Sequence, residues 1–197
     1  INLQKSYDEV RLHTDQLLYP GNYTVKVDFE GSITRNMEGI YPCYFKDAKG
    51  QEQKLIATQF ESHHAREAFP CIDEPAAKAV FNLTLKTSQH KAILGNTPVK
   101  EQSSKDGQVV TSFEPTPKMS TYLLAVAFGN MDYLESKTKN GTLVRSYATP
   151  ANTPHTQFAL ETAVKCLDFY NDYFAIDYPL SKCDFVALPD FASGAME

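Results

Sequence analysis

The sequence predicts a mainly β fold over residues 1–148, followed by a helix and a strand over residues 149–197. Short stretches in which apolar and polar residues alternate recur between turn signals, and no helical stretch interrupts them before Thr149. That pattern is typical of a β-sandwich or barrel. Tyr and Phe number 11 and 12 while Trp is absent, a bias that suits strands.

The first elements lead up to the end of a predicted strand. Residues 1–20 are polar and poorly periodic, so we expect a hairpin or a frayed edge there. Residues 22–30 alternate and predict a half-buried strand, with one side formed by Tyr23, Val25, Val27 and Phe29. Residues 40–45 predict a further strand, in which Pro42 indicates a sheet edge or a bulge.

The next strand is expected at 53–61, which places Gln59 and Glu61 at its C-terminal end. Further strands are expected at 79–86, 91–94, 108–113, 121–128 and 143–148. Residues 121–128 are apolar on both faces, as expected for a central strand.

A helix is expected over residues 158–174. Thr153 and Pro154 suit its N-cap and first position, and Pro179 closes it. Its apolar spacing runs through Leu160, Val164, Leu167, either Tyr170 or Asn171, and Phe174. A strand is expected at 184–188. We therefore predict two domains, at 1–148 and 149–197.

Composition excludes several classes of function. The net charge is −5 and no Lys/Arg run occurs, which argues against nucleic acid or an anionic membrane as partner. The cysteines, Cys43, Cys71, Cys166 and Cys183, form no CxxC pair, so we expect free thiols in the cytoplasm. The alternative is a secreted or cell-surface protein with disulfides, compatible with sequons at Asn22, Asn82 and Asn140. The chain starts without Met, which leaves open a removed targeting segment.

Residues 58–81 hold the densest unusual chemistry. His63 and His64 are adjacent, and we expect their side chains to point in different directions and to bind no metal. HExxH, GxSxG and a glycine-rich phosphate loop are all missing from the sequence. Asp73 could pair with Arg66, whereas Glu61 and Glu197 are solvated carboxylates unless the fold brings them together. Two carboxylates that meet would bind an ammonium group by charge-assisted hydrogen bonds.

Four motifs carry a family resemblance. They are TQFE at 58–61, AREAFPCIDEPAAKAVF at 65–81, PKMSTYLLAVAFG at 117–129 and ALPDFASGAME at 187–197. Together they resemble the aminopeptidase N family of zinc metallopeptidases, and the wording is similar to bacterial members. The last motif matches the family's GAMEN motif as far as its Glu. Four motifs in family order also make an unrelated secreted β-sandwich binding module improbable.

The resemblance implies a fold and a role. Residues 1–148 would form a saddle-like N-terminal β-sandwich without its opening strands, and residues from 149 would begin a thermolysin-like α/β catalytic domain, so we expect a fragment. Members of the family remove N-terminal residues from peptides with a zinc ion held by HExxH and a distant Glu. The resemblance places those groups beyond Glu197, so this chain would hold no catalytic residue and no metal ligand, would need the rest of the polypeptide, and would be inactive alone.

The resemblance also implies which residues would meet a peptide substrate. Glu61 and Glu197 would bind its free α-ammonium, Gly194 and Ala195 would contact its backbone, and Gln59 and Met196 would line the first side-chain pocket. The epoxide-hydrolysing branch has Gln at the position of Glu61, so Glu61 favours the aminopeptidase branch. We also expect a cis peptide bond at Glu61–Ser62. The alternative is a catalysis-free relative that acts as an interaction scaffold.

Overall fold

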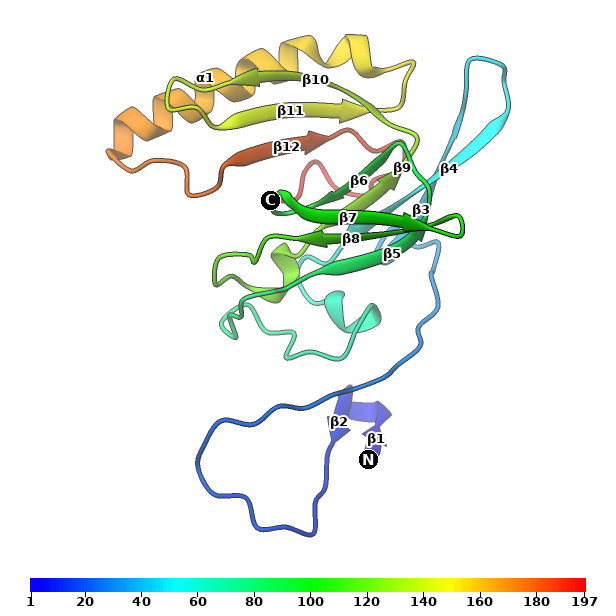
Figure 1. Ribbon diagram of the computed structural model, residues 1–197, viewed down its shortest axis with the longest axis vertical. Coiled ribbons are helices and arrows are strands. Elements are labelled where there is room, and N and C mark those ends of the chain that lie inside the picture. The colour runs from blue at the N-terminus through cyan, green and yellow to red at the C-terminus, as the bar shows by residue number, and fades with distance from the viewer. The chain divides into compact units, whose positions relative to one another are not determined.

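A computed structural model describes all residues from Ile1 to Glu197 (Figure 1). The chain divides into two compact units, Ile1–Ser32 and Ile33–Glu197. Neither unit contains a helix whose length and apolar character would let it cross a membrane.

The first unit contains one small hairpin. Strands β1 (Asn2–Gln4) and β2 (Glu9–Arg11) pair antiparallel around the 3-10 turn η1 (Lys5–Tyr7), which confirms the hairpin expected within residues 1–20. The strand predicted at 22–30 is wrong: these residues form no ladder, and Tyr23, Val25, Val27 and Phe29 are all exposed. Alternation shows only that one side of an extended segment is apolar, and a strand also needs a partner edge, which residues 22–30 do not have here.

The second unit is built around a four-stranded antiparallel sheet. Its order is β3 (Gly39–Lys46), β4 (Glu52–Gln59), β9 (Val126–Gly129) and β6 (Ala92–Gly95). β3 lies at the edge, as Pro42 predicted, because proline cannot donate to a second neighbour. Gly129 is the last residue of β9. A Cβ atom at this position would lie only 2.4 Å from the Cβ atom of Leu55, so only glycine allows β9 to approach β4 this closely.

A second antiparallel sheet has the order β5 (Thr84–Ser88), β8 (Gln108–Phe113) and β7 (Val99–Lys105). β8 lies between the other two and has the predicted bounds. β7 was not predicted, because all seven of its residues are exposed and carry no apolar alternation. β5 begins later than expected, since Ala79 makes only an isolated bridge with Met119.

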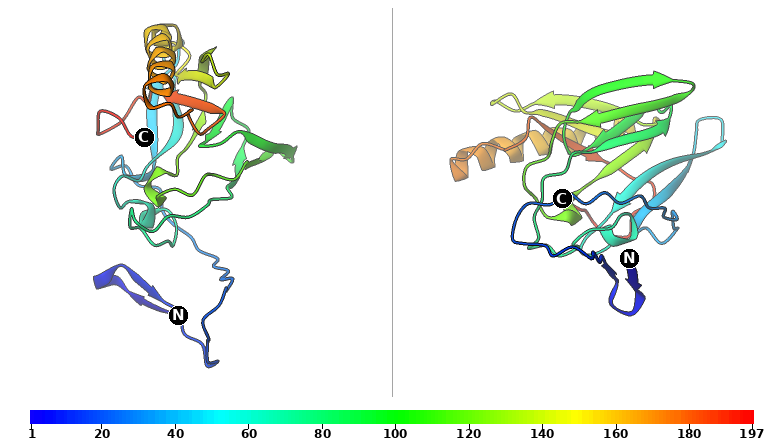
Figure 2. Two further views of the ribbon diagram at one scale, coloured as in Figure 1. Left: turned by 90° about the vertical axis from the view of Figure 1, so that its left-hand side faces the viewer. Right: turned by 60° about the horizontal axis from the view of Figure 1, so that its bottom comes forward.

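A third sheet carries the helix. Its order is β10 (Asp132–Lys137), β11 (Leu143–Ala148) and β12 (Lys182–Val186), and β11 and β12 are parallel. The 3-10 turn η4 (Thr153–Thr156) leads into α1 (Gln157–Phe174). α1 lies along this sheet (Figures 1 and 2), with Leu160 and Ala163 packed on Val144 of β11. At the position that the sequence left open, Asn171 is buried and Tyr170 is exposed.

One further boundary differs from the prediction. Residues 121–128 were expected to form a single strand, but η3 (Thr121–Leu123) precedes the short β9. The amide of Leu123 bonds the carbonyl of Ser120 at 3.1 Å, so a local turn satisfies this backbone in place of a ladder. β9 itself is central, as predicted. The domain boundary at 148/149 stays a prediction.

The arrangement confirms a mainly β fold with one helix near the C-terminal end. The largest cluster of buried side chains lies on the four-stranded sheet and includes Tyr41, Cys43, Leu55 and Ala57. A second cluster surrounds Phe60, just beyond β4. All four cysteines are free thiols. The largest cluster contacts Leu188 and Phe191 in the C-terminal stretch, and the second cluster lies at the end of β4.

Candidate functional site

The end of β4 carries Gln59, Phe60 and Glu61 into three different environments. Gln59 is buried, pairs with Gly39 of β3, and has an Oε1 atom without a hydrogen-bond partner. Phe60 is buried in the second cluster, and Phe69 meets it edge-on with ring centroids 6.1 Å apart. Glu61 is exposed, and its carboxylate has no hydrogen bond or ion pair. Burial of Phe60 therefore fixes the backbone from which the Glu61 side chain enters solvent.

The turn after Glu61 is tightly closed. The Glu61–Ser62 peptide bond is cis, as predicted. The amide of His64 donates to the carbonyl of Phe60 at 3.0 Å, and the 3-10 turn η2 (Ala65–Glu67) follows at once. The bond between the His64 amide and the Phe60 carbonyl holds the start of the turn, and the fully buried Ala65 holds its end.

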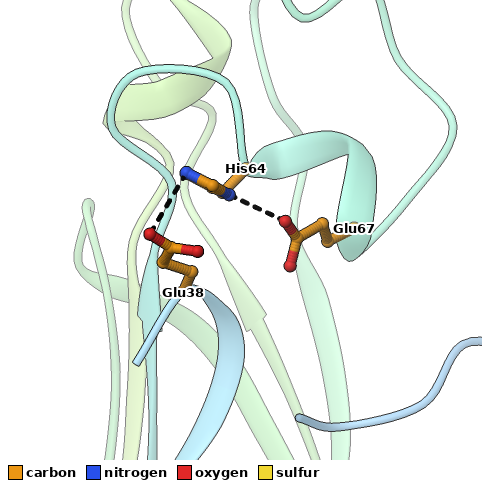
Figure 3. A group of neighbouring side chains, drawn as sticks. All are labelled: Glu38, His64 and Glu67. Carbon is orange, nitrogen blue, oxygen red and sulfur yellow. Dashed lines mark hydrogen bonds and ion pairs between the residues drawn. The ribbon is translucent and has the colours of Figure 1, made fainter. Parts of the chain in front are cut away.

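His64 connects this turn to the residue before β3. Its Nδ1 lies 2.7 Å from Oε1 of Glu67, and its Nε2 lies 3.5 Å from Oε1 of Glu38 (Figure 3). The ring of His63 stacks on that of His64, with centroids 4.6 Å apart and planes 28° apart. The expectation that the two histidines point in different directions is therefore wrong, because they lie on a turn and not on a regular strand or helix.

Glu38, His64 and Glu67 are the residues with ligand chemistry that could surround a cation, with ligand atoms within 4.8 Å of one another. Each ring nitrogen of His64 lies beside a different carboxylate, so both carboxylates already have a partner within the chain. We therefore assign these residues the role of holding the turn.

Arg66 and Asp73 fasten the rest of the loop, as the sequence suggested. The buried carboxylate of Asp73 accepts from the backbone amide of Arg66 at 3.0 Å and from its Nε at 3.2 Å. Cys71 lies beside this pair, and burial, with the charge of Asp73 second, raises the pKa of its thiol to about 11. The loop from Glu61 to Asp73 is thus closed by a backbone bond, by an ion pair whose carboxylate is buried, and by apolar packing.

The C-terminal stretch is docked on β3 by a residue that the sequence did not reveal. The Asp190 carboxylate accepts from the Tyr44 amide at 2.8 Å, and the Asp190 carbonyl accepts from the Tyr41 hydroxyl at 3.1 Å. The thiol of Cys43 reaches the same carbonyl at 3.4 Å. Leu188 and Phe191 pack on the core cluster beneath. An edge strand presents backbone amides that need an acceptor, and this need was the one signal that could have indicated the contact of Asp190 with β3.

Beyond Phe191 the predicted contact residues are loosely held. Gly194, Ala195 and Glu197 are exposed, Met196 is half-buried, and residues 192–197 make no hydrogen bond or ion pair. The structure brings Glu61 and Glu197 into no direct contact. It does tie their two stretches to adjacent strands, since Cys43 pairs with Leu55 and Gly39 pairs with Gln59.

Chain length allows the two carboxylates to meet. From Cys43 to Gly39, the β3 residue opposite Gln59, the distance along a strand is about 13 Å. The residues from Asp190 to Glu197 can span at most about 25 Å. Glu197 can therefore reach the end of β4 while Asp190 stays on β3.

Comparison with known proteins agrees with the sequence resemblance. Residues 1–123 match the family model described as the Peptidase M1 N-terminal domain, and residues 158–197 match that of the Peptidase family M1 domain. The chain is 41% identical over 202 residues to puromycin-sensitive aminopeptidase of Caenorhabditis elegans, covering 100% of the chain and 21% of the relative.

Two further relatives have similar coverage. The identity is 48% over 181 residues to aminopeptidase N of Lactococcus lactis subsp. lactis, covering 90% of the chain and 21% of the relative. It is 44% over 177 residues to aminopeptidase M1-B of Oryza sativa subsp. japonica, covering 90% and 20%. The chain thus spans about a fifth of the length of these relatives.

Proposed function

The chain belongs to the M1 family of peptidases, and on that premise we propose that it serves an aminopeptidase by holding the free N-terminus of a peptide substrate. The observation that carries this proposal is the Glu61 carboxylate, which is exposed and without any internal partner on a turn whose backbone is fixed by Phe60 and His64. A fixed, unpartnered carboxylate suits a cationic ligand, because little freedom is lost when the ligand binds.

Glu197 supplies the second carboxylate in this proposal. The α-ammonium of a peptide has three N–H donors, so it can bond both carboxylates at once. Gly194 and Ala195 offer their backbone to the substrate, and Gln59 and Met196 border the pocket for the first side chain. The Oε1 atom of Gln59 is buried without a hydrogen-bond partner, which is energetically costly. This supports the proposal that a hydrogen-bond donor of the substrate lies at the end of β4.

Two carboxylates at the amine position give a physical basis for removing residues from the N-terminus. An internal peptide amide carries no charge and donates one hydrogen bond. With such a group in place the carboxylates would be desolvated, unpaired and mutually repelling. Substrates with a free α-amine are therefore favoured over blocked ones.

The catalytic metal, zinc by the resemblance, belongs in this proposal to other residues than those of this chain. This chain positions the substrate and is expected to release no amino acid by itself. We further propose a cytoplasmic location, which the four free thiols support.

The test uses the full-length protein and a chromogenic amino-acid anilide. Replacing the carboxylate in Glu61→Gln removes one charge from the amine site, and kcat/KM should fall about 100- to 1,000-fold, as for the loss of a charge contact that the bound substrate shields from water. The matched control is Glu74→Gln, an exposed carboxylate of the same stretch, which should change kcat/KM less than twofold.

An N-acetylated substrate separates amine binding from a general loss of activity. The wild-type preference for the free amine over the acetylated form should shrink in Glu61→Gln. Unchanged activity and preference in Glu61→Gln would overturn the proposal. A wild-type full-length protein that cleaves no anilide after addition of zinc would favour the interaction-scaffold alternative.

A further inference from the structure

A cavity of about 500 Å³ lies inside the second unit, away from the end of β4. Residues of β6, β7, β8, β10, β11 and β12 line it, so all three sheets of this unit border it. Most of its wall is apolar and is formed by Ile93, Leu94, Val99, Phe113, Met131 and Leu143. Its size is within the range of small-molecule sites, about 300–1,000 Å³.

One wall carries a buried cluster of charges. Arg145 donates to Asp184 through two bonds of 2.8 and 2.9 Å, and Lys182 Nζ lies 2.5 Å from the same carboxylate. The side chains of Lys182 and Asp184 are only 7% and 6% exposed, and that of Arg145 is 20% exposed. Two cations thus share a single anion, which leaves one positive charge in excess.

That excess is not offset by other lining groups. Lys91 and Asp132 also line the cavity, and they pair with each other. Tyr133 and Tyr147 place their rings 5.7 and 5.3 Å from the guanidinium of Arg145. Burial raises the pKa of Tyr147 to about 12, so this phenol is neutral at pH 7. The wall of the cavity therefore carries a net charge of +1.

Donors remain on both cations. Lys182 Nζ uses two of its three N–H bonds, on Asp184 and on the Gly95 carbonyl at 2.7 Å. Arg145 has five N–H donors, of which two contact Asp184. A buried cation without a full set of partners is unfavourable, and an anion in the cavity would complete the set.

We propose that this cavity binds a small amphipathic carboxylate, with its carboxylate group on Lys182 and Arg145 and its hydrocarbon part against the apolar wall. Both halves of the ligand follow from the lining: the single excess charge requires one anionic group, and the apolar remainder excludes a purely ionic ligand such as phosphate. This site is independent of the amine site at Glu61.

The experiment is isothermal titration of the full-length protein with three probes: octanoate, octan-1-ol and inorganic phosphate. Octanoate should bind one to one, and the other two should bind at least about tenfold more weakly, since each lacks half of the recognised chemistry. Equal binding of octanoate and octan-1-ol, or no binding of octanoate, would overturn the proposal.

Two variants locate the site. Lys182→Met removes the excess charge and keeps the Arg145–Asp184 pair, and it should weaken octanoate binding about 10- to 100-fold. Lys137→Met, an exposed lysine of β10 outside the lining, is the matched control and should leave binding unchanged. Val99→Trp fills the cavity from the half-exposed start of β7 without touching the charges, so it tests the site even if Lys182→Met does not fold. Unchanged octanoate binding in Val99→Trp would place the ligand elsewhere.

Discussion

The two stretches that carry the proposed amine site are held to the fold in different ways. The loop from Glu61 to Asp73 is closed by backbone bonds, by the buried Asp73 carboxylate and by packing around Phe60. The C-terminal stretch is docked at Asp190 and Phe191, and the residues that follow are without hydrogen bonds.

One carboxylate is thus positioned in advance, while the other is on a segment that must still be ordered. Ordering such a segment on binding costs free energy, whereas a fixed group binds without that cost. We infer that Glu61 sets where the substrate amine lies and that the C-terminal stretch adapts to it.

The largest expected effect comes from opening the well-held loop. Asp73→Ala removes the buried carboxylate that accepts from the backbone amide and the Nε of Arg66. We expect the free energy of unfolding to fall by about 2 kcal/mol, measured by urea denaturation. Glu74→Ala, an exposed neighbour, should change it by less than about 0.5 kcal/mol. A similar loss in both variants would show that the Asp73 contacts do not hold the loop.

A smaller effect is expected from loosening the C-terminal stretch. Asp190→Ala removes the acceptor for the Tyr44 amide but keeps the carbonyl that Tyr41 bonds. Because Tyr44 is on an edge strand where water can replace the carboxylate, we expect a loss of about 1 kcal/mol. Hydrogen exchange at the Tyr44 amide should become about fivefold faster, and Asp190→Asn, which keeps an acceptor, should restore most of the protection. Unchanged exchange in Asp190→Ala would show that the Asp190 carboxylate does not hold the C-terminal stretch on β3.

Much of the second unit could be predicted because its signals are local. β8 and β11 have the predicted bounds, since in each the alternation of residues and the flanking turns agree with the sheet that forms. The sequence gives no signal for β7, whose exposed residues form a strand only because β8 offers them an edge. The stretch at 22–30 shows the reverse case, an amphipathic pattern without a partner strand.

The candidate site divides in the same way. Glu61 could be named from the motif around it, and the pairing of Arg66 with Asp73 from their closeness in sequence. Asp190 could not, because its partner Tyr44 is 146 residues away and only the folded edge of β3 brings them together. The stacking of His63 on His64 was missed for a local reason, since rules for regular elements do not describe a turn.

Two thiols report on the two stretches separately and allow the smallest expected effect to be measured. Cys71 lies in the loop, and Cys43 is fully buried under the C-terminal stretch with its thiol against the Asp190 carbonyl. Alkylation by iodoacetamide under native conditions, followed by peptide mass spectrometry, should modify exposed Cys166 first, Cys71 more slowly and Cys43 last.

The pH dependence of Cys71 follows from its environment. Burial raises its thiol pKa to about 11, so its alkylation rate should rise about tenfold per pH unit from pH 8 to pH 10. At pH 7 the thiol is protonated in the folded and unfolded states, so the raised pKa does not affect stability there. Stability should decrease only as pH rises from about 8.5, where the unfolded thiol ionises, towards 11.

Combining these thiols with Asp190→Ala tests whether the two stretches move independently. Release of the C-terminal stretch should expose Cys43 and raise its alkylation rate about fivefold, in proportion to the expected loss of about 1 kcal/mol. Cys71 should react at its wild-type rate, because its surroundings around Phe60 and Asp73 do not include Asp190. Faster reaction of both thiols would mean that the stretches open together, and the C-terminal stretch could then not adapt to a substrate while Glu61 stays in place.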